Sequence, residues 1–173
     1  ITRTYIWPEV NNYLKTLKEN HYILDVGCGN GKNIIYNTNT ECCDISSTMC
    51  KISKYKGHNV TTANSLCLPY RNAIFDSTMC IACVHHHDTF EQRHKVISEC
   101  LRVTKCGGVF FFSVWKANKK YTGDSYIKWK TNNVQRYYYM YTMHDLNMHF
   151  SKLQSFVYLV REDTQNYYVY IWK

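Results

Sequence analysis

The stretch ILDVGCGNG, residues 23–31, changes from an apolar run into a loop with glycine at every second position. A buried strand that turns sharply while letting a ligand approach its backbone needs glycine there, because a side chain would clash. A helix that starts near Gly31 points its free amide hydrogens at whatever sits in the turn. The stretch therefore predicts a strand, a ligand-binding turn and a helix.

A second short apolar run ends at Asp44, 13 positions after Gly31. The carboxylate of Asp44 can accept both ribose hydroxyl protons of a ligand in the turn. The dinucleotide fingerprint requires its third glycine three residues after the second, a position that is Lys32 here. The pattern Asp-x-Gly-x-Gly-x-Gly is instead typical of S-adenosylmethionine sites, a surface turn being the alternative interpretation. We expect the cofactor to contact Asp25, Gly27, Gly29, Asn30, Gly31, Asp44, Asn64, Ser65, Leu66 and Ala82.

Length and composition favour one domain over residues 1–173, since 173 residues with 45% hydrophobic content bury one core but not two ordinary ones. No apolar stretch approaches the length of a membrane span, and the first ten residues lack the apolar block of a signal peptide. We expect a soluble protein with no membrane partner. The chain opens at Ile1 without a methionine, so we also expect an upstream segment in the natural product.

Nine cysteines lie largely inside apolar runs, which favours buried thiols in a reducing compartment over a disulfide framework. We expect the cytoplasm, with the nucleus as a second candidate. Cys80 and Cys83 form a CxxC with three histidines close behind. Residues three apart in a strand face opposite sides, so the two sulfur atoms are not expected to converge on a metal.

The charge balance of 21 basic to 13 acidic residues gives a net charge of +8, and many basic residues stand beside Tyr or Trp. A polyanionic partner is one explanation. The other is an AT-rich genome, which raises Lys, Asn, Ile and Tyr together.

Apolar runs alternate with amphipathic stretches, which is typical of a doubly wound α/β sheet, mostly parallel. The expected helices are 8–19, 31–37, 47–55 and 90–104, and the expected strands are 22–26, 40–44, 59–63, 75–83 and 108–115. Residues 116–136 read as a loop or lid. Leu153–Val160 and Tyr167–Trp172 are expected to pair as a C-terminal antiparallel hairpin.

Ligands of such sheets bind beyond the carboxyl ends of the strands. One strand end there leads into Asn64, whose side chain could hold an adenine edge, and another leads into three consecutive histidines. We expect His85 and His86 to face the transferable methyl group, whereas His87 reads as an ordinary loop residue.

The chain resembles the eukaryotic tRNA methyltransferases that esterify 5-carboxymethyluridine at the wobble position of the anticodon. The glycine motif is common to all adenosylmethionine enzymes, but three other segments are more specific. These are TRTYIWP at 2–8, the double histidine at 85–86 and QRYY at 135–138. Arg93 and Asp124 also match the family. This chain differs from the family at four positions. The family has an acid where this chain has Asn64, proline in place of Lys128, an aromatic or aliphatic residue in place of His87, and histidine in place of Tyr139.

The resemblance implies transfer of a methyl group to a carboxylate, which is already ionised at neutral pH and needs no general base. Arginine suits such a substrate because its planar fork binds a carboxylate in a fixed orientation. We expect Arg136, with Arg3 as second candidate, to orient the carboxylate, and His85 or His86 to line the pocket. A phosphate contact or a surface ion pair remains the alternative for Arg136. Tyr137 and Trp7 are candidates to stack on an extruded wobble base.

The resemblance also implies a partner, a small zinc-binding activator protein. Strand 59–63 is expected at an open sheet edge, so we expect the activator to pair along residues 60–63. Two rival interpretations stay open: a small-molecule methyltransferase of the quinone or sterol type, and a non-catalytic cofactor-binding scaffold subunit.

Overall fold

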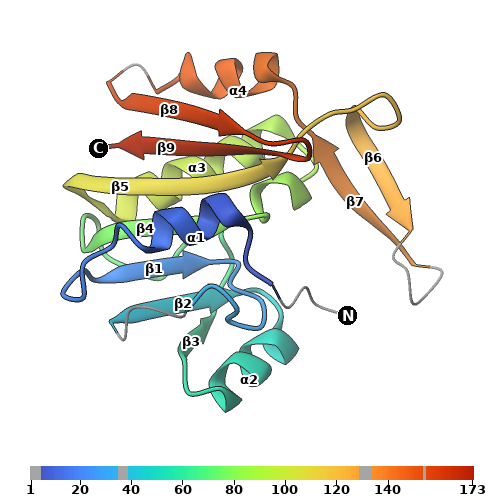
Figure 1. Cartoon of the computed structure of the whole chain (residues 1–173). Coiled ribbons are helices and arrows are strands. Elements are labelled where there is room, and N and C mark those ends of the chain that lie inside the picture. The colour runs from blue at the N-terminus through green and yellow to red at the C-terminus, as the bar shows by residue number, and fades with distance from the viewer. Residues whose placement is uncertain (1–4, 35–38, 129–133, 154) are drawn as a thin grey trace.

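The computed structural model describes residues 5–34, 39–128, 134–153 and 155–173. A seven-stranded sheet of order β3-β2-β1-β4-β5-β9-β8 forms its centre (Figure 1). Its strands are β1 Ile23–Val26, β2 Thr40–Asp44, β3 Asn59–Thr62, β4 Phe75–Ile81, β5 Thr104–Trp115, β8 Val157–Glu162 and β9 Asn166–Trp172. The helices are α1 Pro8–Leu14, α2 Ser47–Tyr55, α3 Phe90–Val103 and α4 Met143–Phe150, with a short 3₁₀ helix, η1, at Val84–His86.

The first five strands are parallel and the last two antiparallel, which confirms the predicted sheet and its terminal hairpin. All four residues of β1 are buried, because the strand lies between β2 and β4 and is covered on both faces. Strand β3 lies at one edge of the sheet, as expected, and β8 lies at the other.

Helices cover both faces of this sheet. Helix α1 packs Val10, Tyr13 and Leu14 against one face, and in Figure 1 it lies in front of the strands. Helices α3 and α4 pack against the other face, where Val96 and Leu146 join the largest cluster of buried side chains. Among the described residues, no helix is long and apolar enough to cross a membrane.

Two predicted helices differ from the structure. Helix α1 ends at Leu14, five residues before the predicted end at 19, and the hydroxyl of Thr16 donates to the Tyr13 carbonyl 2.7 Å away. Such a side-chain bond competes with the helical pattern. In the predicted helix 31–37, residues 31–33 form a turn, and 35–38 lie outside the described residues.

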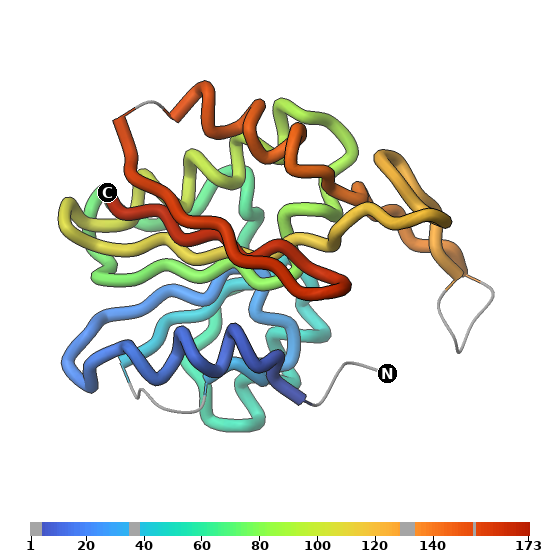
Figure 2. The backbone as a smooth tube through the Cα atoms, turned by 45° about the horizontal axis from the view of Figure 1, so that its top comes forward, coloured from blue at the N-terminus to red at the C-terminus, as the bar shows by residue number. Residues whose placement is uncertain are grey.

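The prediction of a loop at 116–136 is also wrong, because one strand of a second, two-stranded antiparallel sheet lies within it and the other begins at its end. Strand β6, Gly123–Lys128, pairs with β7, Gln135–Met140. We call these two strands, residues 123–128 and 135–140, the β6–β7 arm. Figures 1 and 2 show it extending beyond the main sheet, at the end where β4 and β5 finish. Helix α4, which was not predicted, follows it and begins with a capping box of Thr142 and Asp145.

Candidate functional site

A cavity of about 820 Å³ lies at the carboxyl ends of the parallel strands. This is where ligands bind in open α/β sheets. The β6–β7 arm forms part of its wall. Of the residues predicted from the sequence, the cavity wall includes Gly27, Gly29, Asn30, Asp44, Asn64, Ser65, Ala82, His85, His86 and Arg136.

The loop after β1 has a backbone conformation that requires glycine. Gly27 and Gly29 have φ angles of 71° and 56°, in the left-handed region that glycine adopts without strain. A Cβ added to Gly27 would lie 2.5 Å from the Sγ of Cys83, whereas one on Gly29 would meet nothing within 4 Å. The loop is therefore packed from below at Gly27 and open at Gly29, as a cradle for a ligand must be.

Asp44 ends β2 directly beside this loop. One of its carboxylate oxygens accepts the Gly29 amide at 2.9 Å, and the other accepts the Ser46 amide at 2.8 Å. Each oxygen retains a second lone pair. These two bonds fix the carboxylate at the cavity wall, where it remains able to accept hydroxyl protons from a ligand.

Asp25 lies beneath the loop and is fully buried, so it does not line the cavity. Neither of its carboxylate oxygens meets a donor at hydrogen-bonding geometry among the described residues. Burial raises the pKa of Asp25 to about 7, and the nearby Lys32 and Asn33 offset that rise only in part. A buried carboxylate of this kind, under a glycine cradle, suits a cofactor that carries positive charge, as S-adenosylmethionine does.

The two histidines of η1 are held in opposite tautomers. The Trp115 amide donates to Nδ1 of His85 at 3.1 Å, so the neutral ring of His85 carries its proton on Nε2. Nδ1 of His86 lies 3.2 Å from the Tyr137 carbonyl, which can only accept, so this ring carries its proton on Nδ1. Partial burial and the nearby Arg136 lower the pKa of His86. The pocket therefore meets two neutral rings.

An aromatic stack that the sequence did not predict continues this wall. The Tyr138 ring lies flat on the Trp115 ring, with centroids 4.4 Å apart, and its centroid is 4.6 Å from that of His86. Trp115 comes from the end of β5, and Tyr138 from the arm. The sequence feature that could have indicated this stack is the position of Trp115 at the end of an apolar strand.

The two candidate arginines have different outcomes. Arg136, exposed on β7, stands in the cavity wall near His86. Arg3 lies outside the described residues. Of the candidate base-stacking residues, Tyr137 lines the cavity, but Trp7 is only 7% exposed because it packs edge-on against Tyr168.

Three of the residues predicted to contact the cofactor make other contacts in the structure. The side-chain oxygen of Asn64 accepts the Leu66 amide at 2.9 Å, so one of its lone pairs closes a turn. Leu66 packs against the main core and does not line the cavity. Gly31 is buried away from the wall, and a Cβ there would lie 2.5 Å from His58 and Ser53 atoms.

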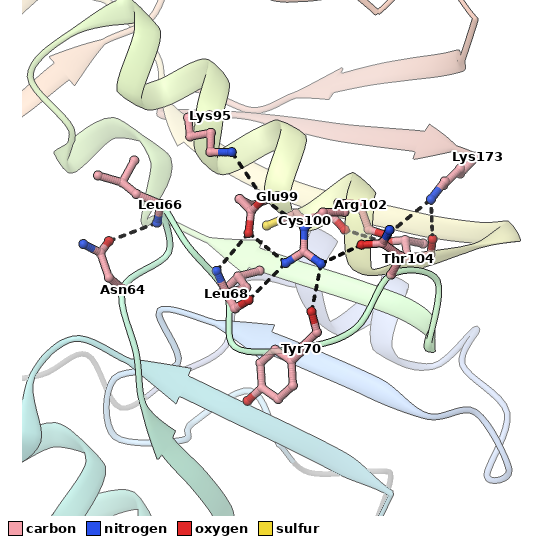
Figure 3. A network of polar contacts seen from close by, with 11 residues as sticks. Asn64, Leu66, Leu68, Tyr70, Lys95, Glu99, Cys100, Arg102, Thr104 and Lys173 are labelled. Atoms are coloured by element: carbon pink, nitrogen blue, oxygen red, sulfur yellow. Dashed lines mark hydrogen bonds and ion pairs between the residues drawn. The ribbon is translucent and has the colours of Figure 1, made fainter.

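The loop that presents Asn64 and Ser65 is tied to α3 by an ion-pair network, shown in Figure 3. Arg102 donates to both carboxylate oxygens of Glu99, at 2.9 and 2.8 Å, and to the carbonyls of Leu68 and Tyr70. These bonds hold the pKa of Glu99 down, at about 2. The network fixes one side of the cavity from outside it.

Arg93, also on α3, anchors a second segment of the cavity wall. Its side chain is buried, and it donates to the carbonyls of His87 and Asp88 at 3.0 and 2.9 Å. Its guanidinium also lies over the Tyr139 ring of the arm. Arg93 thus joins the histidine segment to the arm that supplies Arg136 and Tyr138.

The prediction that the sulfur atoms of Cys80 and Cys83 face opposite sides of a strand is wrong. Strand β4 ends at Ile81, and Ala82 has a φ of 54°, so Cys83 turns back and its thiol contacts that of Cys80. Among the described residues, no group of three His, Cys, Asp or Glu side chains is placed to hold a metal ion.

Comparison with known proteins places this geometry in a family. Residues 24–112 match the model of a methyltransferase domain. A tRNA (carboxymethyluridine(34)-5-O)-methyltransferase of Arabidopsis thaliana is 41% identical over 70% of this chain and 30% of its own length. The Saccharomyces cerevisiae protein of that name is 35% identical over 66% of this chain and 42% of its own length. The chain thus spans less than half of these relatives.

Solved structures support the fold. A SAM-dependent methyltransferase of Methanosarcina mazei has a TM-score of 0.75 at 18% identity, covering 96% of each chain. A SAM-bound amino pentose methyltransferase of Micromonospora has a TM-score of 0.71 at 13% identity, covering 94% of this chain and 88% of that one. The glycine cradle, the acid after β2 and the family match agree, and the chain belongs to the S-adenosylmethionine-dependent methyltransferase domain family.

Proposed function

We propose that this chain transfers a methyl group from S-adenosylmethionine to the carboxylate of 5-carboxymethyluridine at the wobble position of a tRNA anticodon. The observation that supports the proposal most is the position of Arg136, in the wall of the same cavity as Gly29 and Asp44. A carboxylate binder and a cofactor cradle therefore share one space. The relatives named for this reaction point the same way.

The reaction requires the protein to position the substrate carboxylate rather than to transfer a proton. The cofactor, when bound, supplies an electrophilic methyl group. The substrate carboxylate, with a pKa near 4, is already ionised at neutral pH. Arg136 binds one side of it with its planar fork and leaves an oxygen free to react. Too strong a grip would neutralise the nucleophile and lower its reactivity.

The histidines line the pocket without adding to its positive charge. The pKa of His86 is lowered by partial burial and by Arg136, so the ring stays neutral at physiological pH. Two neutral rings beside Arg136 do not compete with its guanidinium for the carboxylate. His85, with its Nδ1 occupied by the Trp115 amide, holds the strand end in place.

The tRNA is expected to bind through phosphate contacts from the basic excess of the chain. An extruded wobble base enters the cavity beside Tyr137, which replaces Trp7 as the candidate for stacking. We place this activity in the cytoplasm, with the nucleus as a second site.

The small zinc-binding activator protein is proposed to pair along the edge strand at residues 60–63. Strand β3 is an edge, and three of its four residues, Asn59, Thr61 and Thr62, are exposed. Beside it, α2 exposes Tyr55 by 95% and Ile52 by 40%. Protection of the Val60–Thr62 amides from hydrogen exchange on adding the activator would support this docking. Unchanged exchange in a stable complex would refute it.

A small-molecule methyltransferase is the rival enzyme, since a cavity of about 820 Å³ would also suit such a substrate. A non-catalytic scaffold subunit is the rival without turnover. Labelled methyl transfer to tRNA that carries 5-carboxymethyluridine, compared with the same tRNA carrying uridine, separates the proposal from both rivals. We expect transfer to the first RNA alone. Transfer to both, or to neither despite measurable cofactor binding, would overturn the proposal.

A further inference from the structure

The β6–β7 arm has features that its position in the cavity wall does not require. It forms its own two-stranded sheet and extends beyond the main one (Figure 2). Of its described residues, only Arg136 to Tyr138, all on β7, contribute to the cavity wall. On the other strand, β6, Tyr126 is 64% exposed, although tyrosine side chains are usually mostly covered.

A ring contact through Tyr137 connects this exposed ring to the cavity wall. Tyr138 is buried at the cavity wall, and Tyr137, its neighbour in β7, lines the cavity. Tyr126 is the cross-strand partner of Tyr137, and the two rings meet edge-to-face with centroids 5.6 Å apart. The exposed face of Tyr126 therefore lies one step outside the cavity.

Positive charge concentrates around the same arm. The described residues between 116 and 141 include five basic side chains and one acidic side chain. Lys116 forms an ion pair with Glu162. The acidic residue, Asp124, accepts a hydrogen bond from the Tyr137 hydroxyl. Lys119, Lys120, Lys128 and Arg136 are exposed. An exposed aromatic ring among cations is the combination that binds single-stranded nucleic acid.

We propose that the β6–β7 arm binds the single-stranded RNA next to the target nucleotide, with a neighbouring base stacked on Tyr126 and the adjoining phosphate near Lys128. This rests on the proposed function, since a nucleotide held in the cavity must have neighbours that cross its rim. The arm is the part of the described structure that stands at that rim and carries the charge that RNA requires. It thereby extends recognition from one nucleotide to the strand around it.

The test measures binding of an RNA hairpin with the sequence of a tRNA anticodon arm, by fluorescence anisotropy at several salt concentrations. Tyr126→Ala should weaken binding about 5- to 100-fold, as loss of one base-aromatic stack does, while Tyr126→Trp should bind like the wild type. Lys128→Gln should reduce the slope of log affinity against log salt by about 0.7. Lys51→Gln, an exposed lysine of α2, is the charge-matched control and should leave the slope unchanged.

Calorimetric affinity for S-adenosylmethionine serves as the check that each variant is folded. RNA affinity unchanged in Tyr126→Ala, with cofactor binding intact, would overturn the proposal. So would a loss seen only in binding of the activator protein. The proposed function is judged separately by methyl transfer: transfer that survives Tyr126→Ala at saturating RNA leaves the reaction standing, whereas Tyr126-dependent RNA binding without any transfer supports the arm alone.

Discussion

The guanidinium carbon of Arg93 lies 3.6 Å from the centroid of the Tyr139 ring. A cation over an aromatic face at this distance is attractive, more so when both groups are shielded from water. Because Arg93 also binds the His87 and Asp88 carbonyls, this one contact couples the histidine segment to the β6–β7 arm. The methyl-transfer pocket thus depends on a residue that does not line it.

Arg93→Met should therefore lower the free energy of unfolding by about 1–3 kcal/mol, because two carbonyls lose their donor. It should also raise hydrogen exchange at the Tyr137–Met140 amides, since the arm loses its anchor. Lys95→Met, an exposed position on the same helix, is the control and should change stability by less than about 1 kcal/mol. Equal exchange in the arm of the Arg93 variant and the wild type would contradict this role.

Asp25 should make stability depend on pH in an unusual direction. Its pKa of about 7 in the folded chain exceeds the ordinary value of 3.8, because burial disfavours the charged form. The folded state therefore loses stability as pH rises between about 4 and 7. Urea unfolding of Asp25→Asn should match the wild type near pH 4 and exceed it by up to about 4 kcal/mol above pH 7.

The matched control for Asp25 is Asp88→Asn, whose side chain is exposed. Its stability relative to the wild type should stay within about 0.5 kcal/mol at every pH. A difference for Asp25→Asn that is the same at pH 4 and pH 8 would show that the Asp25 carboxylate has an ordinary pKa.

Glu99 should behave in the opposite sense. Its hydrogen bonds with Arg102 lower its pKa from 4.5 to about 2, so the pair stabilises the fold above about pH 4.5 and loses that contribution as pH falls toward 2. Glu99→Gln should cost about 1–3 kcal/mol at pH 7 and little near pH 2. Glu19→Gln, at an exposed position, should cost less than about 0.5 kcal/mol. An equal cost at both pH values would point to packing instead.

Arg136→Lys should reduce kcat for methyl transfer about 10- to 100-fold, because a lysine cannot reproduce the two-pronged, charge-assisted bonds of arginine. Calorimetric affinity for S-adenosylmethionine should be unchanged. Arg71→Lys, an exposed arginine on the loop before β4, should leave both quantities as they are. Weaker cofactor binding with kcat preserved would assign Arg136 to the cofactor instead.

The sequence predicted most of the sheet because each parallel strand is a short apolar run ended by a turn signal. The glycine pattern and Asp44 likewise placed the cavity, since these residue types leave few alternatives at a strand end. The β6–β7 arm was missed because β6 and β7 are short and mostly polar apart from their tyrosines, and neither shows the regular alternation of apolar and polar residues that predicts a strand. Arg93 was known as a family residue, but its role depends on Tyr139 and the His87 carbonyl, which only the fold brings together.

The direction of the Asp25 side chain was also not predictable from the sequence. Its place in the glycine motif suggested direct contact with the cofactor, whereas the fold buries it beneath the loop. Residue type and spacing placed it at the strand end, but the side-chain direction there is decided by packing with neighbouring strands.

The most direct test is the chemical nature of the product. The chain, with its activator protein, is given labelled S-adenosylmethionine and tRNA that carries 5-carboxymethyluridine, and the RNA is then treated with mild alkali. A methyl ester releases its label as methanol, which is the result we expect. Label that stays on the RNA through alkaline treatment would show methylation of another atom and would contradict carboxylate esterification.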